Sequence, residues 1–202
     1  MANPYNVVAT DAFDSMQLDA GTLLTEFDFN APYDTPDDDA ILATTTGGIN
    51  PVCEPIYEDL AEDVDNVPNN TKEYLKLTGW NCSMSFTSLK FNADNSVWAL
   101  GSALKTTVPK GTGATEYTKI VPRRDIDHQT DFRDIYGAFP MADGGIFVVK
   151  LLNAISTGGM NIQTTKNGKG TNQMTLTGYM SVQDQSAVPM EFYHIPKPSG
   201  DG

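Results

Sequence analysis

Residues 167–185 read NGKGTNQMTLTGYMSVQDQ, and this stretch predicts a β-strand with two different faces. Apolar and hydroxyl side chains alternate along it, the apolar ones being Met174, Leu176, Met180 and Val182 and the hydroxyl ones Thr175, Thr177 and Ser181. A period of two residues places the two sets on opposite sides of a strand. Gly168 and Gly170 predict a turn before it. We expect one face to pack in a core and the other to present small, uncharged hydroxyl groups.

A second stretch, GWNCSMSFTSLKF (residues 79–91), has the same pattern. Its hydroxyl set is Ser83, Ser85 and Thr87, and its apolar set is Met84 and Phe86. The chain therefore contains two strands with one core face and one hydroxyl face.

The rest of the chain predicts more strands and a single helix. Further strand candidates are residues 40–49, 132–139, 145–156, 159–165 and 188–195, and residues 51–60 continue extended. Asp94 or Asn95 can cap a helix over about residues 94–104, with Val97, Leu100 and Leu104 at helical spacing. Residues 61–77 and the Gly/Thr-rich stretch 106–118 are predicted as loops. This favours a mainly β (α+β) fold, a β-sandwich-like domain with one flanking α-helix, long loops and extended arms.

The domain organisation follows from composition. Residues 1–40 are rich in Asp, Asn and Pro and are predicted to be an acidic N-terminal arm or an ordered loop. The β domain is predicted over residues 41–195, and residues 196–202 are predicted to be a flexible tail.

Charge is distributed very unevenly along the chain. The net charge is -13, and the first 70 residues contain 15 acidic side chains and no Lys or Arg. The remaining residues contain 11 acidic and 13 basic side chains. This argues against an ordinary nucleic-acid-binding protein, which needs a basic patch for the phosphates. A solvated acidic surface that aids solubility accounts for most of these carboxylates.

No motif predicts catalysis, a cofactor or a metal site. The acidic run from Asp63 lacks the Gly and the Glu that a calcium-binding EF-hand loop requires. Asp37, Asp38 and Asp39 could hold a hard cation, but an exposed acidic run is usually only solvated. His128 and His194 have no ligand or triad partner at a recognisable spacing. We therefore expect a protein that is not an enzyme.

Cysteine usage and hydropathy bear on the compartment. Cys53 and Cys82 could form one bridge, but the N-terminus has neither a basic region nor an apolar region typical of export signals. Two reduced, partly buried thiols are therefore expected. The longest apolar stretch, around Lys150, is too short to span a bilayer, so no membrane partner is expected.

The chain resembles the major tail proteins, or tail tube proteins, of long non-contractile-tailed bacteriophages, especially those of Gram-positive hosts. The matching pieces occur in the family's order: QLDAGTLLTEFD, ATTTGGI, EDVDNVPNNTKEYLKL, VPRRD with DFRDIYGAFP, NAISTGGMNIQTT, GKGTNQMTLTGYMS and VPMEFY. The stretches VPKGTGATEYTK and HIPKPSGDG have no counterpart. The resemblance implies a β-sandwich with a flanking helix, hexameric rings stacked into a tube, and inner sheets that join between subunits into a barrel around a DNA channel. It also implies a tape measure protein, a tail terminator and distal tail proteins as partners, with phage DNA passing through without specific binding. The location implied is the virion tail, after synthesis in the host cytoplasm.

This interpretation assigns residues to three surfaces. The predicted lumen-facing residues are Ser83, Ser85, Thr87, Thr175, Thr177 and Ser181, with acidic groups from Glu54, Glu58 and Asp59. The loop 61–77 is predicted to contact the adjacent ring near Asp63, Asp65, Asn69 and Asn70, because long loops without their own structure usually have a function. Arg123, Arg124 or Arg133 of one copy is predicted to meet acidic groups of the next.

Two other functions fit the sequence. A tube from a headless phage-like particle would share every feature above. A carbohydrate-binding β-sandwich, using acidic residues and aromatics such as Tyr33, Tyr57 and Trp80, is a third hypothesis, against which the missing signal sequence argues.

Overall fold

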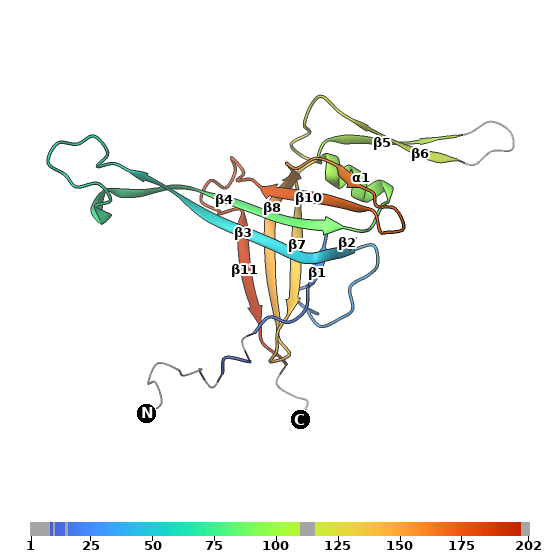
Figure 1. Ribbon diagram of the computed structural model, residues 1–202, viewed down its shortest axis with the longest axis horizontal. Coiled ribbons are helices and arrows are strands. Elements are labelled where there is room, and N and C mark those ends of the chain that lie inside the picture. Colours follow the sequence, from blue (N-terminus) through green and yellow to red (C-terminus); the bar gives the residue numbers. More distant parts are fainter. Residues whose placement is uncertain (1–8, 10, 15, 110–115, 199–202) are drawn as a thin grey trace.

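The computed structural model describes residues 9, 11–14, 16–109 and 116–198, and this part of the chain is mainly β (Figure 1). The strands are β1 (Thr22–Leu24), β2 (Ile41–Ala43), β3 (Thr45–Asp59), β4 (Leu75–Ser88), β5 (Ala103–Val108), β6 (Tyr117–Pro122), β7 (Arg133–Pro140), β8 (Ile146–Ser156), β9 (Asn161–Gln163), β10 (Thr171–Gly178) and β11 (Met190–Ile195). A single α-helix, α1 (Ala93–Leu100), and a short 3-10 turn, η1 (Lys72–Tyr74), complete the described elements. The predicted mainly β class with one helix is confirmed.

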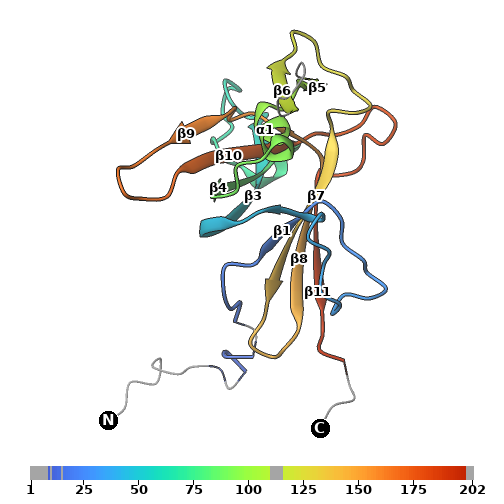
Figure 2. The same cartoon turned by 90° about the vertical axis from the view of Figure 1, so that its right-hand side faces the viewer.

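Nine strands form one antiparallel sheet that bends into two layers. Its order is β2-β1-β7-β8-β10-β4-β3, with β11 also paired to β8 and β9 to β10. β7 pairs with one side of β8. On its other side, β8 pairs with β11 over Ile146–Leu151 and with β10 over Ala154–Ser156. Because β8 changes partner halfway, β7, β8 and β11 cross the direction of β10, β4 and β3 (Figures 1 and 2). This arrangement is sandwich-like.

The first and last strands of the sheet path belong to one continuous segment. β2 ends at Ala43 and β3 begins at Thr45, and the Leu89 amide donates to the Thr44 carbonyl at 2.7 Å. The sheet therefore curls around a single core. Its largest fully buried side chains include Leu23, Met84, Ile135, Leu151, Met174 and Leu176.

The helix differs from its predicted bounds. Asn92, not Asp94 or Asn95, is the N-cap, and its side chain accepts from the Asn95 amide at 2.7 Å. The helix ends at Leu100, and its C-cap is Gly101, whose φ of 74° favours glycine. The residues that follow form β5 instead of more helix, so Leu104 is exposed on a strand. Helical spacing alone could not detect this glycine stop.

The N-terminal region, predicted as an acidic arm or an ordered loop, packs on the main sheet through residues 22–33. β1 lies inside the main sheet, between β2 and β7, and Leu23 and Leu24 are buried. The following loop packs on the sheet through Phe29, whose ring lies 4.6 Å from that of Tyr193. The Tyr33 hydroxyl donates to the Pro196 carbonyl at 2.8 Å, which holds the start of the C-terminal segment. The region predicted as an acidic arm or ordered loop thus contains one short strand of the main sheet, β1.

Two hairpins extend from the body of the molecule. The long β3–β4 hairpin reaches far to one side in Figure 1, and the β5–β6 hairpin extends from the region of α1. The sequence predicted a loop where β5 and β6 form, and residues 110–115 between them lie outside the described residues. The predicted loop 61–77 is shorter in the structure, because Leu75 and the two residues after it belong to β4.

Candidate assembly surfaces

Small polar side chains form rows across β3, β4 and β10 on one face of the sheet. Directly paired residues of antiparallel strands lie on the same face. The pairings give the rows Asn50–Ser85–Thr175, Val52–Ser83–Thr177 and Thr87–Gln173. The five predicted hydroxyl residues in these rows are only partly exposed, and Thr177 shares a hydrogen bond of 2.8 Å with Thr157. We call these three rows the hydroxyl face.

The opposite side of the same strands is buried. Met84, Phe86, Met174 and Leu176 are each at most 4% exposed. Met174 pairs with Phe86, and Leu176 pairs with Met84. The predicted core register of both strands is confirmed. Whether the hydroxyl face lines a channel stays a prediction.

Three residues of the opening stretch do not follow the strand, and one of them, Val182, is 85% exposed. β10 ends at Gly178, so Met180, predicted to face the core, is 44% exposed, and Ser181 lies in a turn instead of on the hydroxyl face. A Cβ at position 178 would lie 2.6 Å from Leu151 Cδ1 and 2.9 Å from the Pro189 carbonyl oxygen. This close packing marks where the chain leaves the sheet. The apparent alternation beyond it was a coincidence of composition.

The three acidic residues predicted for the channel do not share one face. Glu54 pairs with Asn81, in line with the hydroxyl face. Glu58 follows Glu54 at alternate positions of β3 and lies on the same face, where it pairs with Lys76, because the extra residue of the β-bulge near Ile56 belongs to β4. Asp59 lies on the opposite face, where it pairs with Leu75, and Glu54 is the nearest of the three to the hydroxyl face.

Asp59 organises the loop at the hairpin end. Its carboxylate accepts from the Ala61 amide at 2.9 Å and from the Asn70 amide at 2.7 Å. These two hydrogen bonds lower the pKa of Asp59, and the one from Asn70 has the larger effect. The loop from Leu60 to Thr71 is thereby closed on itself. The predicted contact residues Asp63, Asp65, Asn69 and Asn70 all lie exposed in it.

The distal hairpin carries exposed apolar side chains that the sequence analysis missed. Residues 54–58 and 72–78 are all exposed. The large apolar residues among them and in the adjoining loop are 44–55% exposed, namely Ile56, Tyr57, Leu60, Val64, Tyr74, Leu75 and Leu77. We call this set the hairpin apolar surface. Two features of the sequence could have indicated this surface. The two strand segments are too long for a compact core, and apolar residues stand at both ends of the acidic loop between them.

The three arginines predicted at subunit contacts have different surroundings. Arg123 donates to the buried carboxylate of Asp131. The Arg133 guanidinium lies 3.9 Å from the Trp98 ring centroid, and burial lowers the pKa of Arg133. Both therefore have contacts within the subunit. Arg124 is exposed, so of the three it is the best placed for a contact with another copy.

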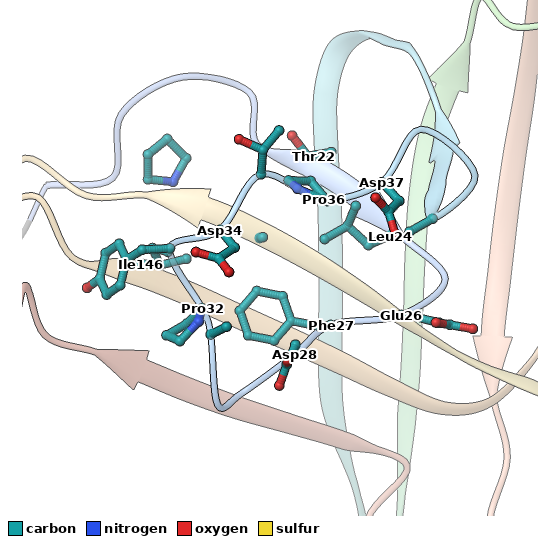
Figure 3. Close-up of a pocket in the computed structure, with 16 residues that line it drawn as sticks. Thr22, Leu24, Glu26, Phe27, Asp28, Pro32, Asp34, Pro36, Asp37 and Ile146 are labelled. Atoms are coloured by element: carbon teal, nitrogen blue, oxygen red, sulfur yellow. The ribbon is translucent and has the colours of Figure 1, made fainter.

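A groove of about 890 Å³ lies beneath the loop that follows β1. Figure 3 shows that Phe27, Pro32 and Pro36 of this loop face the strands carrying Leu24 and Ile146. Its carboxylates are Glu26, Asp28, Asp34 and Asp37. The groove thus combines apolar walls with negative charge, in the most acidic part of the chain.

The remaining sequence candidates are dispersed. His128 stacks on Phe132, with ring centroids 5.8 Å apart, and His194 lies in β11 opposite Phe147. Within the described ranges, no three His, Cys, Asp or Glu side chains are grouped to hold a metal ion. Tyr33 lies on the N-terminal loop and Tyr57 on the distal hairpin, whereas Trp80 packs against the core. The three aromatics proposed for carbohydrate binding therefore form no common surface.

No protein-family model matches this chain, and no curated protein matches it. In the described part of the chain, no helix has the length and apolar character needed to cross a membrane. Function must therefore be argued from the surfaces themselves.

Proposed function

We propose that this chain is a structural subunit that polymerises as stacked hexameric rings to form the tail tube of a long non-contractile-tailed bacteriophage. The tube is a channel for DNA delivery into the host, and the subunit has no enzymatic role. The single observation that carries the proposal is the hairpin apolar surface. A two-stranded ribbon that extends from a domain with seven large apolar side chains exposed is typical of an element that is buried in an assembly.

The hydroxyl face supports the channel part of the proposal. Its rows contain Ser, Thr, Asn, Gln and Val, and the nearest charged residue along the strand pairing is the acidic Glu54. Every basic contact to a phosphate adds affinity for DNA. A neutral to acidic lining therefore lets a duplex pass without being held.

The sheet edge supports the joining of subunits. β3 is the last strand of the sheet path in the described chain, and it runs for 15 residues. A long edge strand is a template for pairing with another chain unless it is covered. Pairing of β3 with a neighbouring copy would extend the hydroxyl face around a ring and remove this edge from water.

Electron microscopy of the purified chain tests the proposal. We expect hollow tubes with sixfold symmetry, and a particle that stays monomeric at high protein concentration would contradict it. Capsid and portal genes beside this one would assign the tube to a phage, and their absence would assign it to a headless particle.

The channel assignment has a separate test in the double variant Thr175→Lys/Thr177→Lys. Both positions are partly exposed, so tubes should still form, while DNA ejection should slow and the slowing should weaken at high salt. Thr175→Ser/Thr177→Ser is the matched control. Unchanged ejection from intact Lys-bearing particles would show that these residues do not line the channel.

A further inference from the structure

Cys53 and Cys82 form a directly opposed cross-strand pair on β3 and β4. Their Sγ atoms are 3.0 Å apart, and they are the two cysteines of the whole sequence. Cys82 is fully buried beside the core, whereas Cys53 is partly exposed. The next pair on the same face toward the tip of the hairpin is Pro55 with Trp80, and Pro55 is already exposed. The two thiols therefore lie where the long hairpin leaves the body.

We propose that Cys53 and Cys82 are a disulfide-forming site whose bond fastens the base of the β3–β4 hairpin, with a low-molecular-weight disulfide as the oxidant. Opposed residues of an antiparallel pair have Cα atoms about 4.5–5.5 Å apart, which lies inside the range of about 4.4–6.8 Å found for disulfides. The ladder continues on both sides of the pair, from Val52 with Ser83 to Glu54 with Asn81. The bond can thus form without moving either strand out of register.

The exposure of the two thiols sets the order of the reaction. Burial and the neighbouring Cys53 raise the pKa of Cys82 to about 12, so Cys82 stays protonated, while the more exposed Cys53 meets the oxidant first. The Cys53 thiolate attacks one sulfur of the small disulfide and releases one small thiol. The Cys82 sulfur then attacks Cys53 Sγ in this mixed disulfide, and the second small thiolate leaves with the proton of Cys82. Two protein thiols are oxidised, and one small disulfide is reduced to two thiols.

The bond would close the distal hairpin into a covalent loop. The two cysteines are 29 positions apart, and the segment between them contains the whole distal hairpin with its apolar surface. Cross-linking the ends of this segment removes conformational freedom from it. In a reducing cytoplasm the pair stays as two thiols, and it becomes oxidised when the protein reaches an oxidising medium. This inference does not depend on the proposed tube function, because it concerns the isolated subunit.

Peptide mapping of the full chain after incubation with oxidised glutathione tests the proposal. Free thiols are alkylated, and the chain is digested with trypsin without reduction. Because the first 70 residues contain no Lys or Arg, Cys53 lies in a peptide that ends at Lys72, and Cys82 lies between Lys76 and Lys90. We expect these two peptides to be joined, lighter than their sum by two hydrogen atoms, and separated by dithiothreitol.

A comparison with unfolded protein shows whether the fold aligns the pair. At a fixed ratio of reduced to oxidised glutathione, the ratio of disulfide to dithiol should be at least about tenfold higher in native protein than in urea. An equal or lower ratio in native protein would overturn the proposal. So would a stable glutathione adduct on Cys53 with Cys82 left free, two unreacted thiols, or disulfide-linked dimers.

Serine variants complete the test. In Cys53→Ser one thiol remains, so no internal cross-link can form and the oxidant should leave the melting temperature unchanged. Oxidation of the native pair should raise the melting temperature by about 5–10 °C. Cys82→Ser should behave in the same way if it folds. If it does not fold, Cys53→Ser alone is a sufficient control. A melting temperature of oxidised native protein equal to that of Cys53→Ser would contradict a stabilising bond.

Discussion

The hairpin apolar surface gives the most direct test of assembly. We choose the double variant Leu75→Thr/Leu77→Thr, because both leucines lie on one face of β4 and threonine keeps the preference for a strand. Each leucine is 46% exposed in the subunit. Full burial of a leucine stabilises by roughly 1.5–3 kcal/mol, so covering the exposed half at a subunit contact contributes about 1 kcal/mol per residue.

Removing both contributions should cost about 2 kcal/mol per contact. At about 1.4 kcal/mol per factor of ten, the critical concentration for tube formation should rise by about thirtyfold. Sedimentation of polymer at a series of protein concentrations measures this quantity. The melting temperature of the unassembled variant should stay close to that of the parent, since surface substitutions usually change stability by less than about 0.5 kcal/mol.

Two controls separate a lost contact from a damaged fold. Val182→Thr changes a side chain that is 85% exposed in the loop after β10, and it should leave the critical concentration unchanged. Leu176→Ala opens the core and should lower the free energy of unfolding by about 2–5 kcal/mol. A folded Leu75→Thr/Leu77→Thr variant with the parent's critical concentration would refute the assignment of this surface to assembly.

Three other perturbations have defined outcomes. The charge asymmetry predicts that the rate of assembly, followed by light scattering, falls when ionic strength is raised from about 0.05 to 0.5 M, and a constant rate would contradict head-to-tail electrostatic contacts. The folded-state pKa of Asp59 is depressed, so its carboxylate stabilises the loop above the unfolded value of 3.8, and this contribution is lost as pH falls through the folded value. Asp59→Asn should therefore speed hydrogen exchange of the Asn70 amide at pH 7, and its effect should shrink as the carboxylate of the parent becomes protonated. Equal exchange at pH 7 would count against the hydrogen bond. Gly178→Ala should destabilise the fold by about 1–3 kcal/mol in a denaturant titration, because its Cβ meets the Pro189 carbonyl at 2.9 Å, while Gly79→Ala, with its nearest neighbour atom 3.9 Å away, should be close to neutral.

The strands that were predictable are those whose two faces differ chemically. Alternation identified the buried faces of β4 and β10, because Met84 and Leu176 point to the core while the serines and threonines between them do not. The same rule failed at Met180, where the close packing of Gly178 ends the strand. The packing partners of this glycine come from β8 and from the segment before β11, which no local pattern reports.

Elements that depend on a distant partner were also missed. β1 is only three residues long, and it is a strand because it lies between β2 and β7. β5 and β6 pair with each other beside α1, although their sequence is rich in Thr and Lys and reads as a loop. Among the site residues, the buried Asp131 that binds Arg123 could not be predicted, because the pair is formed by the folding of the segment between them.

The β-bulge in the long hairpin links the fold to the proposed assembly. Thr78 has no partner in the ladder, and its hydroxyl donates to the Ile56 carbonyl at 3.0 Å. With this extra residue, Tyr57 pairs with Leu77 on one face and Glu58 pairs with Lys76 on the other.

Without the bulge, Tyr57 would pair with Thr78, and Glu58 would pair with Leu77, because the register beyond it would shift by one residue. The apolar Leu77 would then lie opposite the charged Glu58 instead of opposite Tyr57. The bulge therefore places Tyr57 opposite Leu77 and Glu58 opposite Lys76, while the proximal ladder keeps Ser83 and Ser85 on the hydroxyl face. One continuous strand pair can in this way present a smooth polar surface near the body and an adhesive surface at its end, which are the two properties that a self-assembling channel subunit requires.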